Sequence, residues 1–364
     1  MTAPAGETPA DLPGPVLVVG AGLLGTSTAL ALRRCGVDVA VSDVSVQNLR
    51  IATAVGAANV AAAEIQPGLV VVAVPPDHLG DVIAEHLRGT DAVVTDVGSV
   101  KSAPLAAAAA LVDADALRRY VGGHPLAGSE RSGPFAASAA LFDGRPWAVT
   151  PHSDSDPAAV AAVRALARAC GATPVAFTPE EHDEAVARTS HLPHLLAALV
   201  AGRLSDAPAT HLTLTGQGIR DVTRIAAGDP ALWQQIVTAN AEAVSALLRA
   251  VRADLDELAE AVLAGDRGAI GALLDRGVTG TTKLPGKHGG PARAETALYV
   301  AVPDHPGELA RLLSDTGEIG VNVEDLRIDH DPDRPVGLVE LTVAADRLEH
   351  LQTALQDRGW TTHR

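Results

Sequence analysis

The sequence predicts an α/β protein with a doubly wound, mainly parallel sheet, then an all-α domain, then a small βαββαβ domain. Three observations support this fold class. Short apolar runs alternate with alanine-rich helical stretches up to about residue 178, strand patterns then vanish for about a hundred residues, and they return over about the last 70. The expected divisions are a disordered tail at 1–14, the sheet domain at 15–178, the helical domain at 179–283, a linker at 284–294 and the small domain at 295–364.

The composition fits a globular protein with more than one hydrophobic core. The chain has 364 residues, 47% of them hydrophobic, and a net charge of −16, which argues against nucleic acid or a membrane surface as a partner. No apolar run approaches the length of a membrane span, and Met1–Pro15 lacks a signal pattern. Cys35 and Cys170 have no metal-ligand spacing around them, so a reducing, cytoplasmic setting is expected.

A glycine-rich turn follows the first apolar run. From Val16 the sequence reads Val-Leu-Val-Val-Gly-Ala-Gly-Leu-Leu-Gly, so a strand leads into Gly20-x-Gly22-x-x-Gly25 and then into a helical stretch. In a dinucleotide site the first glycine makes the tight turn, the second lets the backbone approach the pyrophosphate, and the third lets the helix pack on the strand. A structural glycine turn is the alternative, but the flanking strand and helix, with an acid 18 positions after the last glycine, favour a Rossmann-type site.

Asp43, at the end of the second apolar run, is that acid. Its carboxylate suits the ribose hydroxyls and would repel a 2′-phosphate, and the next residues supply no cation, so NAD is favoured over NADP. The expected cofactor-binding residues are Gly20, Ala21, Gly22, Leu23, Leu24, Gly25, Asp43, Val74 and Pro75.

The remaining elements follow from the same patterns. Further strands of the first sheet are expected at Leu69–Val74, Ala92–Asp96, Tyr120–Gly122, Trp147–Thr150 and Thr173–Phe177. In the helical domain Thr178-Pro179-Glu180-Glu181 has the pattern of a capping box, and Asp229-Pro230 opens a helix that runs to about Ala264. The small domain has a ferredoxin-like order, with elements at Ala297–Val302, Pro306–Thr316, Val321–Asp329, Val336–Val343, Asp346–Arg358 and Trp360–His363.

The long helix carries an apolar seam whose spacings alternate between four and three residues. The seam consists of Val244, Leu248, Val251, Leu255, Leu258 and Val262. A helix of this length must bury such a stripe, and a second copy of the chain is the favoured cover. The sequence therefore predicts a homodimer formed through the helical domain, with burial inside one subunit as the alternative.

Two residues near the ligand-binding edge of the first sheet are candidates for proton transfer. His124 stands between Gly123 and Pro125 in a loop expected after a short strand, and a histidine there can act as a base near neutral pH. Ser99 follows another strand and could hydrogen-bond the substrate or the base. The structural alternatives are a hydrogen-bonded loop histidine and a serine that caps a helix.

Further candidates lie in the helical domain. His191 and His194 are three apart on one helical face, which Pro193 kinks. No third metal ligand is evident nearby, so no metal is expected. Arg220 and Arg224 are four apart, and arginine pairs with carboxylates bidentately, so a substrate with two carboxylates would need such cations.

Together these motifs resemble the prephenate/arogenate dehydrogenase family of tyrosine biosynthesis, with a C-terminal domain similar to the amino-acid-binding ACT domains. The motifs cover most of the chain and are Gly20–Gly25, Asp96–Lys101, Gly123–Gly133, His182-Asp183, Ser190–His194, Arg220–Arg224 and Pro230–Asn240. The resemblance implies NAD-dependent oxidative decarboxylation of prephenate to 4-hydroxyphenylpyruvate. Hydride passes to the nicotinamide, and aromatisation drives the loss of CO2.

The resemblance also implies roles for single residues. It assigns the base to His124 and the hydroxyl that orients this base to Ser99. It assigns the binding of a substrate carboxylate to Arg224, and it places His194 in the wall of the substrate pocket. Arg220 is either a second substrate ligand or the partner of Asp221, and His191 is either a substrate ligand or a helix-packing residue.

The identity of the substrate stays open. Relatives often have a glycine run before the Arg-Asp stretch, where this chain has the bulky polar Gln217. Arogenate dehydrogenase, whose substrate carries an amino group in place of the ketone, is therefore an alternative. The β-hydroxyacid dehydrogenases place a catalytic lysine on the helical domain, whereas this chain has no lysine between residues 102 and 282. A non-enzymatic sensor of NAD and amino acids would need no base.

The resemblance to ACT domains predicts an effector site in the small domain. Its expected residues are Asp304, His305, Pro306, Gly307 and Asn322. Pro306 can start a helix whose N-terminus suits a carboxylate, and Asn322 can bind both an ammonium and a carboxylate. L-Tyrosine, the end product of the pathway, is the expected feedback ligand, and a domain that only aids assembly is the alternative.

Overall fold

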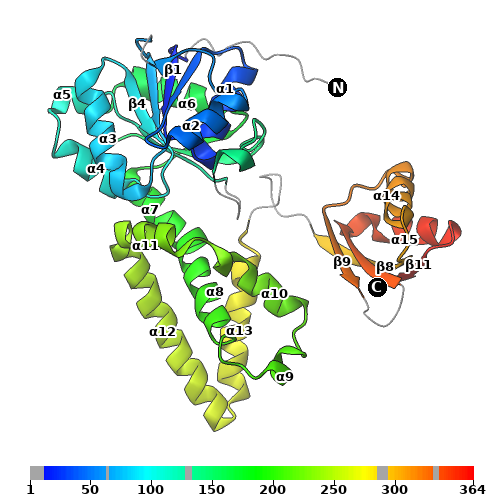
Figure 1. Ribbon diagram of the computed structural model, residues 1–364. Coiled ribbons are helices and arrows are strands. Elements are labelled where there is room, and N and C mark those ends of the chain that lie inside the picture. Colours follow the sequence, from blue (N-terminus) through cyan, green and yellow to red (C-terminus); the bar gives the residue numbers. More distant parts are fainter. Residues whose placement is uncertain (1–11, 63–64, 128–132, 285–293, 331–335) are drawn as a thin grey trace. The chain divides into compact units, whose positions relative to one another are not determined.

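The computed structural model of the chain describes residues 12–62, 65–127, 133–284, 294–330 and 336–364 (Figure 1). By internal contacts the chain divides into two compact units, of which the first ends at Ala253 and the second begins at Asp254. Most of the tail expected at 1–14 and of the linker expected at 284–294 lies outside the described residues. No helix in the described ranges is long and apolar enough to cross a membrane.

The first unit begins with a four-stranded parallel sheet in the order β2-β1-β3-β4. Its strands are β1 (Val16–Val19), β2 (Val39–Ser42), β3 (Leu69–Val72) and β4 (Val93–Asp96). The helices around it are α1 (Leu23–Arg34), α2 (Val46–Ala54), α3 (Pro76–Gly89), α4 (Ser102–Ala109) and α5 (Ala114–Leu117). Parallel strands with helices on both faces are apolar along their whole length, which is the pattern of β1 and β3. The expected doubly wound arrangement is confirmed for these four strands, whereas the later strands, which the sequence predicts in the same sheet, form a separate one.

A second sheet has the order β5-β6-β7. An isolated parallel bridge pairs Val94 of β4 with Tyr120, which lies just before β5. It contains β5 (Gly122–Pro125), β6 (Pro146–Thr150) and β7 (Thr173–Ala176), with the turn η2 (Pro134–Ala136) and helix α6 (Pro157–Ala169) between them. β5 runs antiparallel to β6, whereas β6 and β7 are parallel. The sequence predicted β5 at Tyr120–Gly122, which is wrong: His124 lies within the strand and not in a loop after it.

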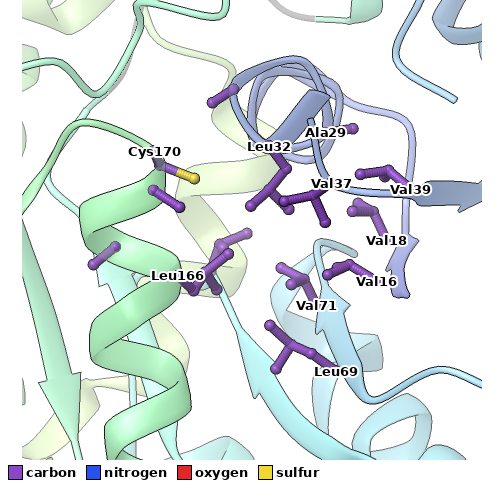
Figure 2. Close-up of a cluster of buried hydrophobic side chains, with 14 of the residues drawn as sticks. Val16, Val18, Ala29, Leu32, Val37, Val39, Leu69, Val71, Leu166 and Cys170 are labelled. Carbon is purple, nitrogen blue, oxygen red and sulfur yellow. The ribbon is translucent and has the colours of Figure 1, made fainter. Parts of the chain in front are cut away.

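Apolar side chains from alternate strand positions fill both faces of the first sheet. Figure 2 shows one face, where strand residues meet α1 and α6; the labelled side chains are Val16, Val18, Ala29, Leu32, Val37, Val39, Leu69, Val71, Leu166 and Cys170. On the other face the core contains Leu17, Val70, Val72, Leu79, Ile83, Leu87 and Tyr120. Because both faces are covered, polar side chains can act only at the ends of the strands.

Helices and short helical turns follow β7. They are α7 (Pro179–Val186), the π-helical turn η3 (Ala187–His191), α8 (Leu192–Gly202), α9 (Ala209–Leu212), α10 (Gln217–Thr223), η4 (Arg224–Ala227), α11 (Pro230–Ala239), α12 (Ala241–Ala264) and α13 (Arg267–Thr281). The single helix expected from Asp229 to Ala264 is wrong, because it breaks at Asn240, where φ is −116° and ψ is 34°. The π-helical turn precedes Pro193, which has no N–H to give to the regular helical pattern.

The second unit contains a ferredoxin-like sheet domain with the order βαββαβ. Its elements are β8 (Glu295–Pro303), α14 (Glu308–Ile319), β9 (Asp325–His330), β10 (Val336–Ala344), η5 (Ala345–Arg347), α15 (Leu348–Asp357) and β11 (Thr361–His363). The strand order is β11-β8-β10-β9, and all pairings are antiparallel. The helix expected to start at Pro306 starts at Glu308, because Gly307 caps it in a left-handed conformation with φ of 96°.

Candidate active site

The glycine turn between β1 and α1 leaves space for a dinucleotide phosphate. Gly20 has φ of 107°, and a Cβ built there would lie 2.3 Å from the Ala73 carbonyl oxygen. A Cβ on Gly25 would lie 1.9 Å from the Gly20 carbonyl oxygen, whereas a Cβ on Gly22 would meet no atom within 4 Å. Packing therefore requires two of the glycines, and the third borders open space at the start of α1, where unpaired N–H groups suit a phosphate.

Asp43 lies beside this turn, directly after β2. Its carboxylate accepts hydrogen bonds from the backbone N–H groups of Ala21 and Ser45, both at 2.6 Å. The carboxylate is therefore fixed next to the glycine turn, where it suits the ribose hydroxyls. Val74 and Pro75 follow β3 at the same edge of the sheet, and Pro75 is the N-cap of α3.

A buried ion pair joins the end of β4 to β5. Asp96, the last residue of β4, accepts hydrogen bonds from the Lys101 ammonium and, at 2.9 Å, from the Tyr120 hydroxyl. Nζ of Lys101 also donates to the carbonyl oxygen of Gly123, at 2.6 Å. Burial lowers the pKa of the Lys101 amine, and the charge of Asp96 opposes that effect. These contacts fix β5 against β4 and give His124, the next residue, a defined position.

Two glycines allow β5 to approach its neighbours this closely. A Cβ on Gly122 would lie 2.4 Å from the Thr150 hydroxyl oxygen, and a Cβ on Gly123 would lie 2.7 Å from the Asp96 carbonyl oxygen. The sequence Gly-Gly-His is therefore explained by packing on both sides of the strand. Residues 128–132 of the glycine-containing motif that follows lie outside the described residues.

His124 is hydrogen-bonded to a second histidine, which is bonded to a carboxylate. Nδ1 of His124 lies 2.9 Å from Nε2 of His182, and Nδ1 of His182 lies 2.9 Å from Oδ1 of Asp183. The two imidazole rings meet edge to face, with centroids 5.1 Å apart. All three side chains are buried. Nδ1 of His124 is thus engaged, and among the described residues no hydrogen bond joins its Nε2 to another group.

Helix α7 brings His182 and Asp183 to this position. The predicted capping box Thr178–Glu181 is present, with both reciprocal hydrogen bonds formed, and it fixes the start of the helix. One turn later the Asp183 carboxylate accepts hydrogen bonds from the backbone N–H groups of Lys101, at 2.8 Å, and Ser102, at 2.9 Å. The carboxylate therefore ties α7 to the first turn of α4, where the helix dipole favours a negative charge.

Burial favours the neutral form of both histidines. It lowers the pKa of His124 well below its usual value, and the neighbouring His182 and Lys101 lower that pKa further. Burial also lowers the pKa of His182, although the hydrogen bond to Asp183 opposes this. Burial alone would raise the pKa of Asp183, but hydrogen bonds from His182 and Ser102 outweigh it and lower that pKa. At neutral pH the carboxylate is charged and the two imidazoles are neutral.

A second histidine pair lies along η3 and α8. His194 stacks on the indole of Trp233, with ring centroids 3.5 Å apart, and His191 lies edge-on to the same indole at 6.1 Å. The Asn240 side-chain amide nitrogen lies 3.2 Å from Nδ1 of His191 and donates to the Asp183 carbonyl oxygen at 2.8 Å. Burial lowers the pKa of His191 to about 4. In the part of the chain that the structure describes, no three His, Cys, Asp or Glu residues are grouped to hold a metal ion.

Two family profiles match the chain in succession. Residues 28–176 match the profile described as prephenate dehydrogenase, nucleotide-binding domain, and residues 178–275 match prephenate dehydrogenase, dimerization domain. A protein of Streptomyces niveus named probable prephenate dehydrogenase NovF is 39% identical over 358 residues, which are 94% of this chain and 98% of that protein. The chain belongs to the prephenate dehydrogenase family.

Solved structures agree with this assignment. A prephenate dehydrogenase of A. aeolicus, determined with hydroxyphenyl propionate and NAD+, is 28% identical with a TM-score of 0.65, and the match covers 73% of this chain and 96% of that chain. An arogenate dehydrogenase of Synechocystis is 27% identical with a TM-score of 0.63, covering 74% of this chain and 99% of that one. As a member of the family the chain is an NAD-dependent oxidoreductase, which confirms the predicted cofactor.

Three of the other predicted substrate residues lie on two short helical elements that follow α8. Gln217, Arg220 and Arg224 lie exposed on α10 and η4, and the Gln217 amide donates to Asp221 at 2.9 Å. The η4 turn packs against α8, the helix that carries His194. Ser99 lies half-buried in the loop between β4 and α4, and none of the hydrogen bonds among described residues joins it to His124.

The sequence predicts no role for the hydrogen-bond partners of His124. His182 and Asp183 belong to one of the motifs that carry the family resemblance, and no role is predicted for Asp96, Asn240 or Trp233 either. His124 and His182 are 58 residues apart, so no local pattern links them. The one available signal is the capping box, which places residues 182 and 183 in the first turns of a helix.

Asp43→Asn should narrow the preference for NAD over NADP, measured as the ratio of kcat/KM for the two cofactors. Ala21 and Ser45 bind different oxygens of the carboxylate, so the amide keeps the hydrogen bond from only one of these N–H groups, and it removes the charge that repels a 2′-phosphate. Asp38→Asn is the matched control, because this exposed acid bonds the Asn59 amide and should not affect the ratio. A wild-type preference for NADP would contradict the assignment of Asp43.

Proposed function

We propose that the chain catalyses the oxidative decarboxylation of prephenate to 4-hydroxyphenylpyruvate for tyrosine biosynthesis, in the cytoplasm, where the thiols of its two cysteines stay reduced. The observation that carries this proposal is the buried, neutral His124, whose Nδ1 is engaged by His182 and whose Nε2 is left to accept a proton. NAD, when bound, supplies the acceptor for a hydride. The open glycine turn and Asp43 are the residues that would hold it.

His124 acts on the ring hydroxyl in the proposed reaction. Its Nε2 accepts the hydroxyl proton as the hydride leaves the same carbon, and a carbonyl forms there. The bond between the ring and the carboxylate then breaks, and its electron pair moves through the ring to the carbonyl oxygen. That oxygen takes the proton back from His124 and becomes the phenol. One hydride and one CO2 leave the substrate, and His124 returns to its starting form.

The test is the formation of NADH with prephenate or arogenate as the only second substrate. Prephenate should give the higher kcat/KM. Arogenate is the second candidate, because Gln217 stands next to the predicted carboxylate ligands and an arogenate dehydrogenase is among the structural matches. Formation of no NADH with either acid would contradict the proposed activity.

Arg224→Ala should raise the KM for prephenate more than it changes the affinity for NAD. A charge-assisted bidentate contact with a carboxylate is worth about 1.5–3 kcal/mol, which corresponds to roughly a 10- to 100-fold change. Arg220→Ala is the matched comparison, because Arg220 lies four residues away on the same segment. Ser99→Ala should instead lower kcat if Ser99 orients the base. A larger KM effect for Arg220→Ala than for Arg224→Ala would assign the carboxylate to the other arginine.

We infer that residues 179–283 form a domain that binds substrate and joins two copies of the chain. The apolar seam of α12 supports this, because Val244 is buried whereas Leu255 and Val262 are 55% and 59% exposed in the single chain. A second copy would cover these side chains, as the description of the matching dimerization domain implies for the family. Sedimentation should give a dimer, and Leu255→Arg should shift it toward the monomer.

We infer further that the ferredoxin-like domain is an ACT domain that binds L-tyrosine as a feedback inhibitor. Asp304, His305, Pro306 and Gly307 lie exposed in the loop between β8 and α14, and the Asn322 amide donates to Glu324 at 2.9 Å. Tyrosine should inhibit the full chain more strongly than a chain ending at Gly289, by a coupling of about 1–3 kcal/mol. Equal inhibition of both forms would mean that tyrosine competes at the active site.

A further inference from the structure

A neutral histidine can act as a base only through the nitrogen that lacks a proton. Its imidazole carries one proton, on either Nδ1 or Nε2, and the hydrogen bond made by one nitrogen decides the state of the other. In His124 the nitrogen left for the substrate is Nε2. The proposed function therefore requires the proton to be on Nδ1, and burial alone does not select that tautomer.

The hydrogen bonds of Asp183 determine the direction of the whole chain of contacts. Its carboxylate faces the backbone N–H groups of Lys101 and Ser102, which can only donate. An ionised carboxylate can only accept, so Nδ1 of His182 must donate to Asp183 at 2.9 Å. Nε2 of neutral His182 then has no proton and must accept, so Nδ1 of His124 must donate to it at 2.9 Å. The lone pair of His124 is left on Nε2.

We propose that His182 and Asp183 are positioning residues that fix the tautomer of His124, so that its Nε2 is always ready to accept the substrate proton. This inference rests on the proposed function of His124 as the base. The lowered pKa values of both histidines and of Asp183 agree with it, because each group is in the protonation state that the chain of hydrogen bonds needs at neutral pH.

Lys101 holds both ends of this chain of hydrogen bonds. Its backbone N–H binds the Asp183 carboxylate at 2.8 Å, and its ammonium binds the carbonyl oxygen of Gly123, the residue before His124, at 2.6 Å. The base and the carboxylate are therefore both fixed to one residue at the start of α4. The side chains of His124, His182 and Asp183 are buried. Water therefore does not donate a hydrogen bond to Nδ1 of His124, which would favour the other tautomer.

The decisive measurement is the ¹⁵N NMR spectrum of histidine-labelled full-length protein at neutral pH, with the His124 signals assigned by comparison with His124→Asn. The wild type should show His124 with a protonated Nδ1 and an unprotonated Nε2. A proton on Nε2 would overturn the inference whatever the enzymatic activity is. Because this readout needs no substrate, it is separate from the test of the proposed function, which is the formation of NADH from prephenate.

Two substitutions of His182 test its role in catalysis. A glutamine can accept from His124 with its oxygen and donate to Asp183 with its nitrogen, whereas a leucine can do neither. His182→Leu should lower kcat by at least about tenfold, with a smaller change in KM, and the proton of His124 should be divided between Nδ1 and Nε2. His182→Gln should restore most of kcat and most of the protonation of Nδ1. Equal losses of kcat in the two variants, with an unchanged His124 spectrum, would overturn the inference.

A matched control separates positioning of the base from placement of the helix. Thr178→Ala removes the capping box at the start of α7 without touching His182 or Asp183. It should lower the melting temperature while leaving kcat within about twofold and the His124 signals unchanged. A loss of kcat as large as that of His182→Leu would mean that the position of α7, and not the tautomer, controls activity.

Discussion

His124→Asn should lower kcat for prephenate by about 10²–10⁴, which is the usual contribution of a positioned general base. The asparagine amide can reach the place of Nδ1, so it keeps a hydrogen bond to His182, but it has no atom at the place of Nε2. The packing of β5 and the glycine turn are untouched, so the affinity for NAD should change little. Turnover is measured by NADH formation and NAD affinity by calorimetry.

The control for this substitution is another histidine of the same unit. His152 lies after β6 and bonds the Leu117 carbonyl oxygen at 3.1 Å, so His152→Asn should leave kcat nearly unchanged. If His124→Asn instead weakened NAD binding and left turnover normal at saturation, His124 would be a structural residue.

The pH dependence of the wild type should agree with this assignment. His124 acts as a base only when it is neutral, so kcat/KM should fall as the pH falls through its pKa in the free enzyme. Burial, His182 and Lys101 all lower that pKa from its usual value of 6.5. The acid limb should therefore lie below pH 6.5, with full activity at neutral pH. An acid limb above pH 6.5 would mean that another group controls the reaction.

Sequence patterns predicted best what a short stretch of chain determines by itself. The first βα unit was predicted correctly because an apolar run, three glycines and a helical stretch stand within 20 residues, and each glycine that packing requires has its own steric reason. The capping box at Thr178–Glu181 was predicted for the same reason, since both of its hydrogen bonds are local.

The errors occurred where contacts between distant residues override local preference. Gly123 has little strand propensity and lies beyond the predicted strand, yet it is part of β5, because only glycine fits against the end of β4. The sequence around Asn240 predicts a continuous helix. In the structure the Asn240 side chain donates to the Asp183 carbonyl oxygen, and the helix breaks at Asn240. The partners of His124 were missed for the same reason.

Lys101→Met should lower the free energy of unfolding by about 3–5 kcal/mol, which is the cost of leaving one member of a buried ion pair without its partner. Side-chain exposure is only 1% for Lys101 and 0% for Asp96. Methionine fills a similar volume but leaves the Asp96 carboxylate with hydrogen bonds only from Tyr120 and backbone N–H groups. It also leaves the Gly123 carbonyl oxygen without the Lys101 ammonium. Denaturant unfolding of the full chain measures the loss.

Arg34→Met is the matched control, because Arg34 and Asp143 form an ion pair with side chains 38% and 47% exposed. This substitution should cost less than about 1 kcal/mol, since water screens exposed pairs. Adding Asp96→Asn to Lys101→Met should recover part of the lost stability, because no uncompensated charge is then buried. If Lys101→Met costs no more than Arg34→Met, the buried pair does not fix β5. The position of His124 would then depend on the pairing of β5 with β6 and on its contact with α7.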